Sequence, residues 1–180
     1  MALAQEKIYT IDDIYALPEG DRAELIDGQI YYMAPPSRIH QEISYWLGLE
    51  IGNYIRSKNG SCKVYPAPFA VFLNSDDINY VEPDISVICD KNKLNKKGCN
   101  GAPDWIIEIV SPSTKKQDYA IKLFKYRTAK VREYWIVDPE KRRITVWDFE
   151  HDDLEEYAFS DSVKVHIYDD LTIDFSQLEL

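Results

Sequence analysis

The run Trp105-Ile-Ile-Glu-Ile-Val110 constrains the fold more than any other stretch, because it has the composition of a buried strand with a carboxylate at its centre. An unbroken run of branched aliphatic side chains is typical of a strand that is covered on both faces. Burying Glu108 among them is costly unless its charge is paired, protonated or neutralised by a cation. The run therefore predicts a covered β-sheet and, at Glu108, a site that holds positive charge.

Two helices and a hairpin are expected before that strand. Thr10 and the acids after it predict a short helix that ends near Pro18-Glu-Gly20, and Asp27-Gly28 predicts a hairpin over residues 23–33. Ser37 is expected to cap a long helix whose apolar residues recur at helical spacing. The buried face of this helix is expected to contain Ile39, Ile43, Trp46, Leu47, Ile51, Tyr54 and Ile55.

Seven β-branched or aromatic runs are expected to form strands. They cover residues 67–73, 82–89, 104–111, 133–137, 143–149, 155–159 and 163–167. A further helix is expected over 114–129, capped by Ser113 or Thr114. This order predicts an α/β (α+β) fold, with a central mixed β-sheet flanked by helices and extra hairpin strands at the C-terminus. With 180 residues and no linker-like stretch, the chain is expected to be one domain, residues 1–180.

The cysteines and the first residues bear on the compartment. Cys62, Cys89 and Cys99 are odd in number and form no C-x-x-C pair, which favours free thiols in a reducing compartment over a disulfide framework or a zinc site. The first ten residues lack an apolar signal region, and no apolar run approaches the length of a membrane span. We therefore expect a cytoplasmic protein without a membrane partner.

The charge is distributed unevenly along the chain. The formal net charge of −10 argues against a polyanionic partner. However, residues 148–180 hold eleven acidic side chains and one lysine, whereas residues 91–143 hold fourteen basic and six acidic ones. Two interpretations stay open: a basic surface for nucleic acid, and lysines scattered on solvated loops. Under the first, the positive charge of 91–143 is expected to face the functional site.

Asp84 and Glu108 lie on two neighbouring predicted strands. Side chains alternate along a strand, so Asp84 points away from Ile85, and Glu108 shares its face with Val110. Sequential strands usually pair, which would let both carboxylates project from one face. Converging carboxylates repel and need a cation between them, and hard oxygen ligands suit Mg²⁺ or Mn²⁺. A divalent metal cofactor is therefore expected here.

The helix after Glu108 carries Asp118, Lys122 and Tyr126 at positions i, i+4 and i+8, on one stripe. Two acids and a lysine at a divalent metal suit phosphodiester hydrolysis, because the metal activates water and the ammonium stabilises developing charge. Taken alone, Asp118 and Lys122 are better explained as a surface ion pair. Lys125 lies close to Lys122 on the helix surface and competes for the same role.

Three stretches together resemble the Uma-type restriction endonucleases of the PD-(D/E)xK nuclease superfamily. They are Val81-Glu-Pro-Asp84, the string from Gly101 to Thr114, and Asp118…Lys122…Tyr126 followed by Val131-Arg-Glu-Tyr-Trp-Ile-Val-Asp-Pro139. Glu24-Leu-Ile-Asp-Gly28 and His40 fit the same family, so the resemblance covers roughly residues 8 to 150. It implies a restriction-endonuclease-like sheet, nuclease activity, and an assembly of two copies.

The resemblance also carries roles to single residues. It implies that Asp84 is the acid of the Pro-Asp motif and that Glu108 is the acid of the (D/E)-x-K motif. The motif lysine belongs two residues after Glu108, where this chain has Val110. Uma-type proteins supply that lysine from the following helix, here Lys122. Glu24 matches an upstream acid that completes the metal shell.

The leading hypothesis is a Mg²⁺-dependent endonuclease that acts on DNA. Asp84, Glu108 and the Ile109 carbonyl bind the metal, and Lys122 orients or activates the water. The alternative is a non-enzymatic nucleic-acid- or protein-binding module on the same scaffold, favoured by Val110 and the net negative charge. A glycosidase carboxylate pair is a third hypothesis. A homodimer through the β-rich C-terminal half is expected, because cutting both strands of a duplex usually needs two active sites.

Overall fold

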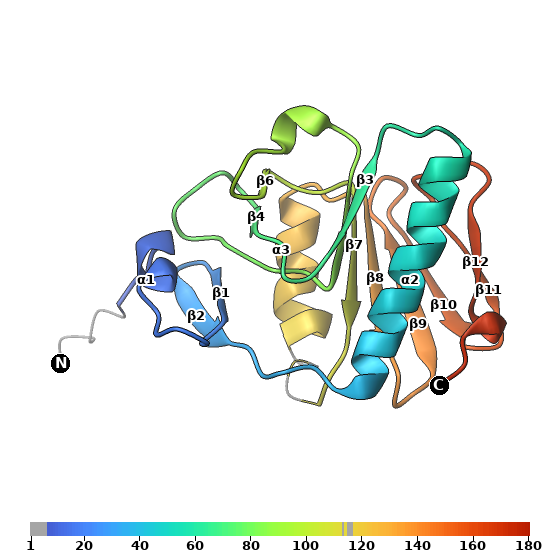
Figure 1. Cartoon of the computed structure of the whole chain (residues 1–180), viewed down its shortest axis with the longest axis horizontal. Helices are drawn as coiled ribbons and strands as arrows, with labels where there is room; N and C mark the ends of the chain where they lie inside the picture. Colours follow the sequence, from blue (N-terminus) through green and yellow to red (C-terminus); the bar gives the residue numbers. More distant parts are fainter. Residues whose placement is uncertain (1–6, 113, 115–116) are drawn as a thin grey trace.

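The computed structural model describes residues 7–112, 114 and 117–180, and a six-stranded sheet forms its centre (Figure 1). The strand order is β10-β9-β8-β7-β5-β3, and β7 and β8 are the parallel pair in an otherwise antiparallel sheet. The bounds are β3 (Lys63–Pro66), β5 (Ile85–Ile88), β7 (Trp105–Ile109), β8 (Glu133–Asp138), β9 (Arg143–Asp148) and β10 (Asp153–Ala158). The predicted central mixed sheet is confirmed.

Helices cover both faces of this sheet (Figure 1). The long helix α2 (Arg38–Ser57) packs Ile43, Leu47 and Ile51 on a core that also contains Trp105 and Trp135. The opposite face meets a π-helix, η2 (Gln117–Lys122), that continues into α3 (Leu123–Thr128). Because both faces are covered, β5, β7 and β8 are buried along their whole length. This explains the unbroken aliphatic run around Glu108.

Smaller elements surround the sheet. At the N-terminal side lie α1 (Ile11–Tyr15) and the hairpin β1 (Ala23–Ile26) with β2 (Gln29–Tyr32). Two short pairs follow, β4 (Val71–Phe72) with β6 (Cys99–Asn100), and β11 (Ser162–Lys164) with β12 (Thr172–Asp174). The 3-10 helices are η1 (Lys91–Lys93) and η3 (Phe175–Gln177).

The predicted hairpin and helix cap are confirmed. Asp27 and Gly28 adopt φ angles of 50° and 73°, the left-handed conformation that a two-residue hairpin turn needs. Ser37 precedes α2, and its side chain accepts a hydrogen bond from the His40 N–H. The prediction for Ile39 was wrong: it is 40 % exposed, because the first turn of α2 lies beyond the buried cluster that begins at Ile43.

Three secondary-structure predictions need correction. The strand expected over 67–73 shortens to Val71–Phe72, and the strands at 63–66 and 172–174 were not predicted. The helix expected over 114–129 is a wide π-turn followed by one and a half turns of α-helix. Ser113, one of its two predicted caps, lies outside the described residues, as do Lys115 and Lys116.

The prediction of three free thiols was wrong for two of them. Cys62 and Cys89 form a disulfide. Lys63 pairs with Ile88 in the antiparallel register, so Cys62, just before Lys63, lies opposite Cys89, just after Ile88. Cys99 remains a free, buried thiol. Within the described part of the chain, no helix is both long and apolar enough to cross a membrane.

Candidate active site

Asp84 lies directly across from Glu108 at one end of the sheet. The antiparallel register pairs Ile85 with Ile107, and the same register one step further sets Asp84 opposite Glu108. Glu108 points to the side of the sheet that carries α3, where Ile106 and Val110 are also buried. Asp84 and Glu108 therefore face each other across the two strands, as strand alternation and pairing predicted.

Two groups hold one oxygen of the Asp84 carboxylate. Asp84 Oδ2 accepts a hydrogen bond of 2.7 Å from the Ile109 N–H and lies 3.0 Å from His40 Nε2. Among the described residues, Asp84 Oδ1 has no hydrogen-bond partner. The first turn of α2 thus supplies His40 to fix the aspartate, while the second oxygen stays available.

Glu108 is 4 % exposed, and two groups from the π-helix and α3 contact the same oxygen. Glu108 Oε1 accepts from Tyr126 OH at 2.6 Å and lies 2.9 Å from Lys122 Nζ. Tyr126, which shares the helical stripe of Lys122, thus directs its hydroxyl to Glu108. The burial of Glu108 is therefore compensated by a cation and a phenol.

Lys122 is the centre of a buried ion cluster. Its ammonium lies 2.8 Å from Glu24 Oε2, 2.9 Å from Glu108 Oε1 and 3.7 Å from Asp118 Oδ1. Glu24 reaches it from β1 and also accepts the Glu82 N–H. The side chain that competed with Lys122, Lys125, is directed elsewhere, to Asp27 in the hairpin turn at 2.5 Å.

The cluster holds more negative than positive charge, and this excess together with burial shifts the pKa values of Glu108, Asp118 and Lys122. Burial raises the pKa of Glu108 well above its usual range, and Asp84 adds to this effect while Lys122 opposes it. Burial likewise raises the pKa of Asp118 to about 6. Burial alone would lower the pKa of Lys122, but Glu108, Glu24 and Asp118 together raise it well above its usual value, so it stays charged.

These side chains line a cleft of about 170 Å³ between the hairpin, the start of α2 and the ends of β5 and β7. Within the described residues, its charged lining consists of Arg22 and Lys122 against five acids: Glu24, Glu82, Asp84, Glu108 and Asp118. Arg22 Nε and Nη2 both donate to Glu82 Oε2. Sequence reasoning missed both residues of this pair. Glu82 stood inside the quoted Val81-Glu-Pro-Asp84 motif, whereas nothing in the sequence pointed to Arg22.

The basic segment does not line this cleft in the way expected. β5 runs away from Asp84, and η1 follows its far end, so Lys91 and Lys93 lie at the opposite end of the strand. Lys93 Nζ donates to the Ala102 carbonyl near the start of β7. For these lysines, the predicted orientation toward the site was wrong.

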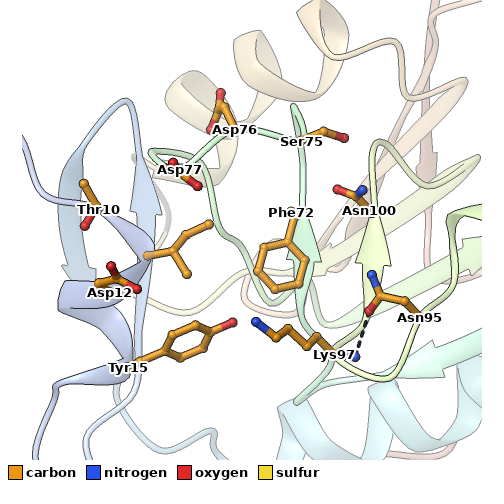
Figure 2. A pocket seen from close by; sticks show the side chains of 11 residues that line it. Thr10, Asp12, Tyr15, Phe72, Ser75, Asp76, Asp77, Asn95, Lys97 and Asn100 are labelled. Atoms are coloured by element: carbon orange, nitrogen blue, oxygen red, sulfur yellow. Dashed lines mark hydrogen bonds between the residues drawn. The ribbon is translucent and has the colours of Figure 1, made fainter.

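A second pocket, of about 410 Å³, lies between α1 and the loops at 74–77 and 95–100 (Figure 2). Tyr15 and Phe72 form its aromatic walls, and the Lys97 ammonium lies 5.6 Å from the centre of the Tyr15 ring. It shares no lining residue with the acidic cleft. The predicted site residues therefore gather in the smaller cleft, which has more charged residues in its lining.

Comparisons with known proteins point to one family. The Uma2 family, described as "Putative restriction endonuclease", matches residues 11–177. "Uncharacterized protein slr1290" from Synechocystis sp. is 28 % identical over 128 residues, which is 71 % of this chain and 66 % of that protein, just under two thirds of its length. The crystal structure of "a putative nuclease belonging to DUF820" from Anabaena variabilis superposes with a TM-score of 0.76 at 21 % identity, covering 94 % of this chain and 96 % of the other. At that identity the likeness shows a shared fold.

Proposed function

The chain belongs to the Uma2 restriction endonuclease family, and from this premise we propose that it hydrolyses phosphodiester bonds of DNA with the help of a divalent metal ion. The observation that supports this most is the pairing of Asp84 with Glu108 in a cleft that also contains the Lys122 ammonium. Opposed carboxylates next to a fixed cation suit reactions that develop negative charge on phosphate oxygens.

The donors in the cleft suit Mg²⁺ or Mn²⁺. Asp84 Oδ1 is available because its other oxygen is held by His40 and the Ile109 N–H. Within the described residues, no three His, Cys, Asp or Glu side chains are arranged to hold a metal by themselves. The proposed ligands are therefore Asp84, Glu108 and the Ile109 carbonyl, with water or substrate oxygens completing a weak, exchangeable shell.

The excess of acids is a second reason to expect a metal. Five carboxylates against two cations would repel a polyanion, and a divalent ion removes most of that repulsion. A bound Mg²⁺ lowers the pKa of a coordinated water and neutralises charge on the phosphate. Metal binding between Asp84 and Glu108 also favours the ionised form of Glu108, against the effect of its burial.

Lys122 would stabilise the charge that develops on the phosphate or orient the attacking water. Glu24 and Asp118 hold its ammonium from two sides, which keeps the long side chain in one place. The resemblance implied that Glu24 is a site acid that completes the metal shell. Its contact with Lys122 supports a different role, which is to position that lysine. His40 is proposed to position Asp84 in the same way.

A second candidate is a binding module without catalysis. The observation that favours it is the burial of Lys122, whose side chain is 5 % exposed and already contacts three carboxylates. In that case the ion cluster would have a structural role, and the cleft would hold nucleic acid without cutting it.

A nicking assay separates the two candidates. The full-length protein should convert supercoiled plasmid to the open circle in Mg²⁺ or Mn²⁺ but not in EDTA. Asp84→Asn should lose this activity, whereas Asp12→Asn, which changes an exposed acid of the other pocket, should retain it. Equal nicking by wild type and Asp84→Asn would contradict the proposed site. Failure of the wild type to nick in either metal would favour the binding module.

We also propose a homodimer, and the structure limits how it can form. The edge strand β10 carries Asp153, Glu155 and Glu156, so pairing two copies of β10 around a two-fold axis would oppose like charges. The expected C-terminal interface must therefore use another surface. Light scattering that gives a mass near the 21.0 kDa of one chain would contradict the dimer.

A further inference from the structure

Two strongly exposed tyrosines lie beside the acidic cleft. Of the thirteen tyrosines, Tyr15, Tyr32 and Tyr45 are exposed, at 54 %, 67 % and 70 %. Tyr32 lines the cleft, at the end of β2. Tyr45 lies on α2 next to an adjoining groove. Exposed aromatic rings at such a position have little structural reason, because burial would stabilise each of them.

The adjoining groove continues the cleft. It runs between α2 and the edge strand β3, with a volume of about 380 Å³. Three residues, Gln41, Ser44 and Ala67, line both the groove and the cleft, so the two are contiguous. The rest of its lining is apolar or small apart from the Tyr45 hydroxyl, namely Tyr45, Gly48, Leu49, Val64 and Pro66.

No charged side chain lines this groove in the described structure, and only Arg22 and Lys122 are cations in the cleft. Both cations are already paired with carboxylates. A duplex is bound mainly through its phosphates, and that mode needs a row of free cations. Neutral, flat bases suit an apolar groove with an exposed ring, because bases stack on aromatic side chains.

The burial of Glu108 and Lys122 also favours an unpaired strand over a duplex. The side chains of Glu108 and Lys122 are each 5 % exposed, below the rim formed by Tyr32 and the start of α2. A phosphate of an unpaired strand can bend into such a recess. A regular duplex would have to be deformed to bring its backbone there, at an energetic cost.

We propose that the substrate of this site is an unpaired polynucleotide strand, and that Tyr32 and Tyr45 stack on bases to either side of the phosphate in the cleft. This inference rests on the proposed nuclease function and narrows its substrate from DNA in general to unpaired segments. The groove between α2 and β3 holds the bases on the Tyr45 side.

Binding is tested with a twelve-nucleotide oligothymidylate and with the same strand paired to oligoadenylate. All proteins carry Asp84→Asn, so that nothing is cleaved during the titration. The single strand should bind at least about tenfold more tightly than the duplex, and Tyr32→Ala and Tyr45→Ala should each weaken it about tenfold through lost stacking. Tyr45→Phe keeps the ring and should bind normally. Tyr15→Ala, at the other pocket, is the matched control and should also bind normally (Figure 2).

The position of the bases is tested by replacing thymine with 5-iodouracil and irradiating the complex. Cross-links should map to Tyr45 or Tyr32, and none to Tyr15. Equal or tighter binding of the duplex, or unchanged binding by both alanine variants, would overturn the inference. So would a Tyr45→Ala variant that changes the mass of the protein in light scattering but not its affinity for the strand, because the groove would then be a contact between copies of the chain.

The nuclease function and the preference for an unpaired strand can be contradicted independently of each other. If the wild type nicks plasmid in Mg²⁺ but the Asp84→Asn protein prefers the duplex in the titration, the nuclease function stands and the unpaired-strand inference falls. If the wild type does not nick plasmid and the Asp84→Asn protein binds neither oligonucleotide, both fall together.

Discussion

Lys122 Nζ lies 2.9 Å from Glu108 Oε1, although the lysine belongs to a helix and the glutamate to a central strand. The residue two positions after Glu108 is Val110, which is buried and offers no charge. The cation therefore reaches the strand from the next element in the chain. The wide π-turn over Gln117–Lys122 ends at this lysine, which fits the frequent occurrence of such turns at functional sites.

Replacing Lys122 should separate catalysis from metal binding. Lys122→Met keeps a long side chain but removes the ammonium, so cleavage should fall by about a hundredfold or more through loss of charge stabilisation. Metal binding, followed by calorimetry, should persist because Asp84 and Glu108 remain. Some stability should also be lost, since Glu24, Glu108 and Asp118 would lose their shared cation.

Lys125→Met is the matched control, three residues away in the same helical segment. Lys125 contacts Asp27 in the hairpin turn and not the acids of the cleft, so its variant should keep most of the activity. Full activity in both variants would mean that this helix supplies no catalytic lysine. A larger loss in Lys125→Met would transfer the role to Lys125.

Strand alternation, together with the pairing of sequential strands, was enough to predict that Asp84 and Glu108 can project from one face of the sheet. The period of two is rigid, and sequential strands usually pair, so the two residues have few alternatives. The contacts of Lys122 and Lys125 could not be predicted in the same way. A helix of 3.6 residues per turn makes them near neighbours, whereas the π-turn and the hairpin at Asp27 send them to different acids.

The disulfide and the walls of the cleft could not be predicted from the sequence, because both depend on which distant segments pack together. Counting cysteines predicted free thiols, but only the register of β3 against β5 reveals that Cys62 faces Cys89. Arg22 and Tyr32 reach the cleft because the hairpin folds back beside the sheet. That packing depends on contacts far apart in the chain, such as Leu25 with Tyr80, which no local pattern encodes.

Asp84→Asn should remove the metal site without unfolding the protein. Asparagine retains a side-chain oxygen for the Ile109 N–H but loses the charge that would attract a divalent ion. Calorimetry with Mn²⁺ should show weak binding to the wild type and none to the variant. Heats that are identical for the two proteins would refute Asp84 as a ligand.

Tyr126→Phe should make Glu108 harder to ionise. The phenol donates to the Glu108 carboxylate at 2.6 Å, and a hydrogen bond to the charged form lowers the pKa of an acid. Its loss should therefore raise the pKa of Glu108 further and move the acidic limb of the pH–activity profile to higher pH. Stability should fall by about 2 kcal/mol, the usual effect of losing a buried hydrogen bond to a charged group. An unshifted profile would mean that Glu108 does not need to ionise for cleavage.

Glu133, at the start of β8, should make stability depend on pH at a distance from the cleft. Its carboxylate accepts hydrogen bonds from Trp135 Nε1 and from the N–H groups of His166 and Ile167, which fasten the segment between β11 and β12 to the sheet. Burial nevertheless outweighs these donors and raises the pKa of Glu133 from 4.5 to about 7. The folded protein therefore holds this proton more tightly than the unfolded chain does.

This difference in the pKa of Glu133 between the folded and unfolded states sets the direction in which stability changes with pH. Below about pH 4.5 both states are protonated, and the favourable contribution is complete. As the pH rises toward about 7, Glu133 ionises in the unfolded chain but stays largely protonated in the folded protein, so up to about 3 kcal/mol of relative stability is lost.

Glu133→Gln does not titrate, so the stability of the wild type should fall relative to this variant between pH 5 and 7.5 and then level off. Urea denaturation at each pH measures the difference, and Glu155→Gln, which removes a different carboxylate that contacts the same segment at His166, is the control. Parallel curves for wild type and Glu133→Gln would show that the hydrogen bonds keep Glu133 ionised throughout.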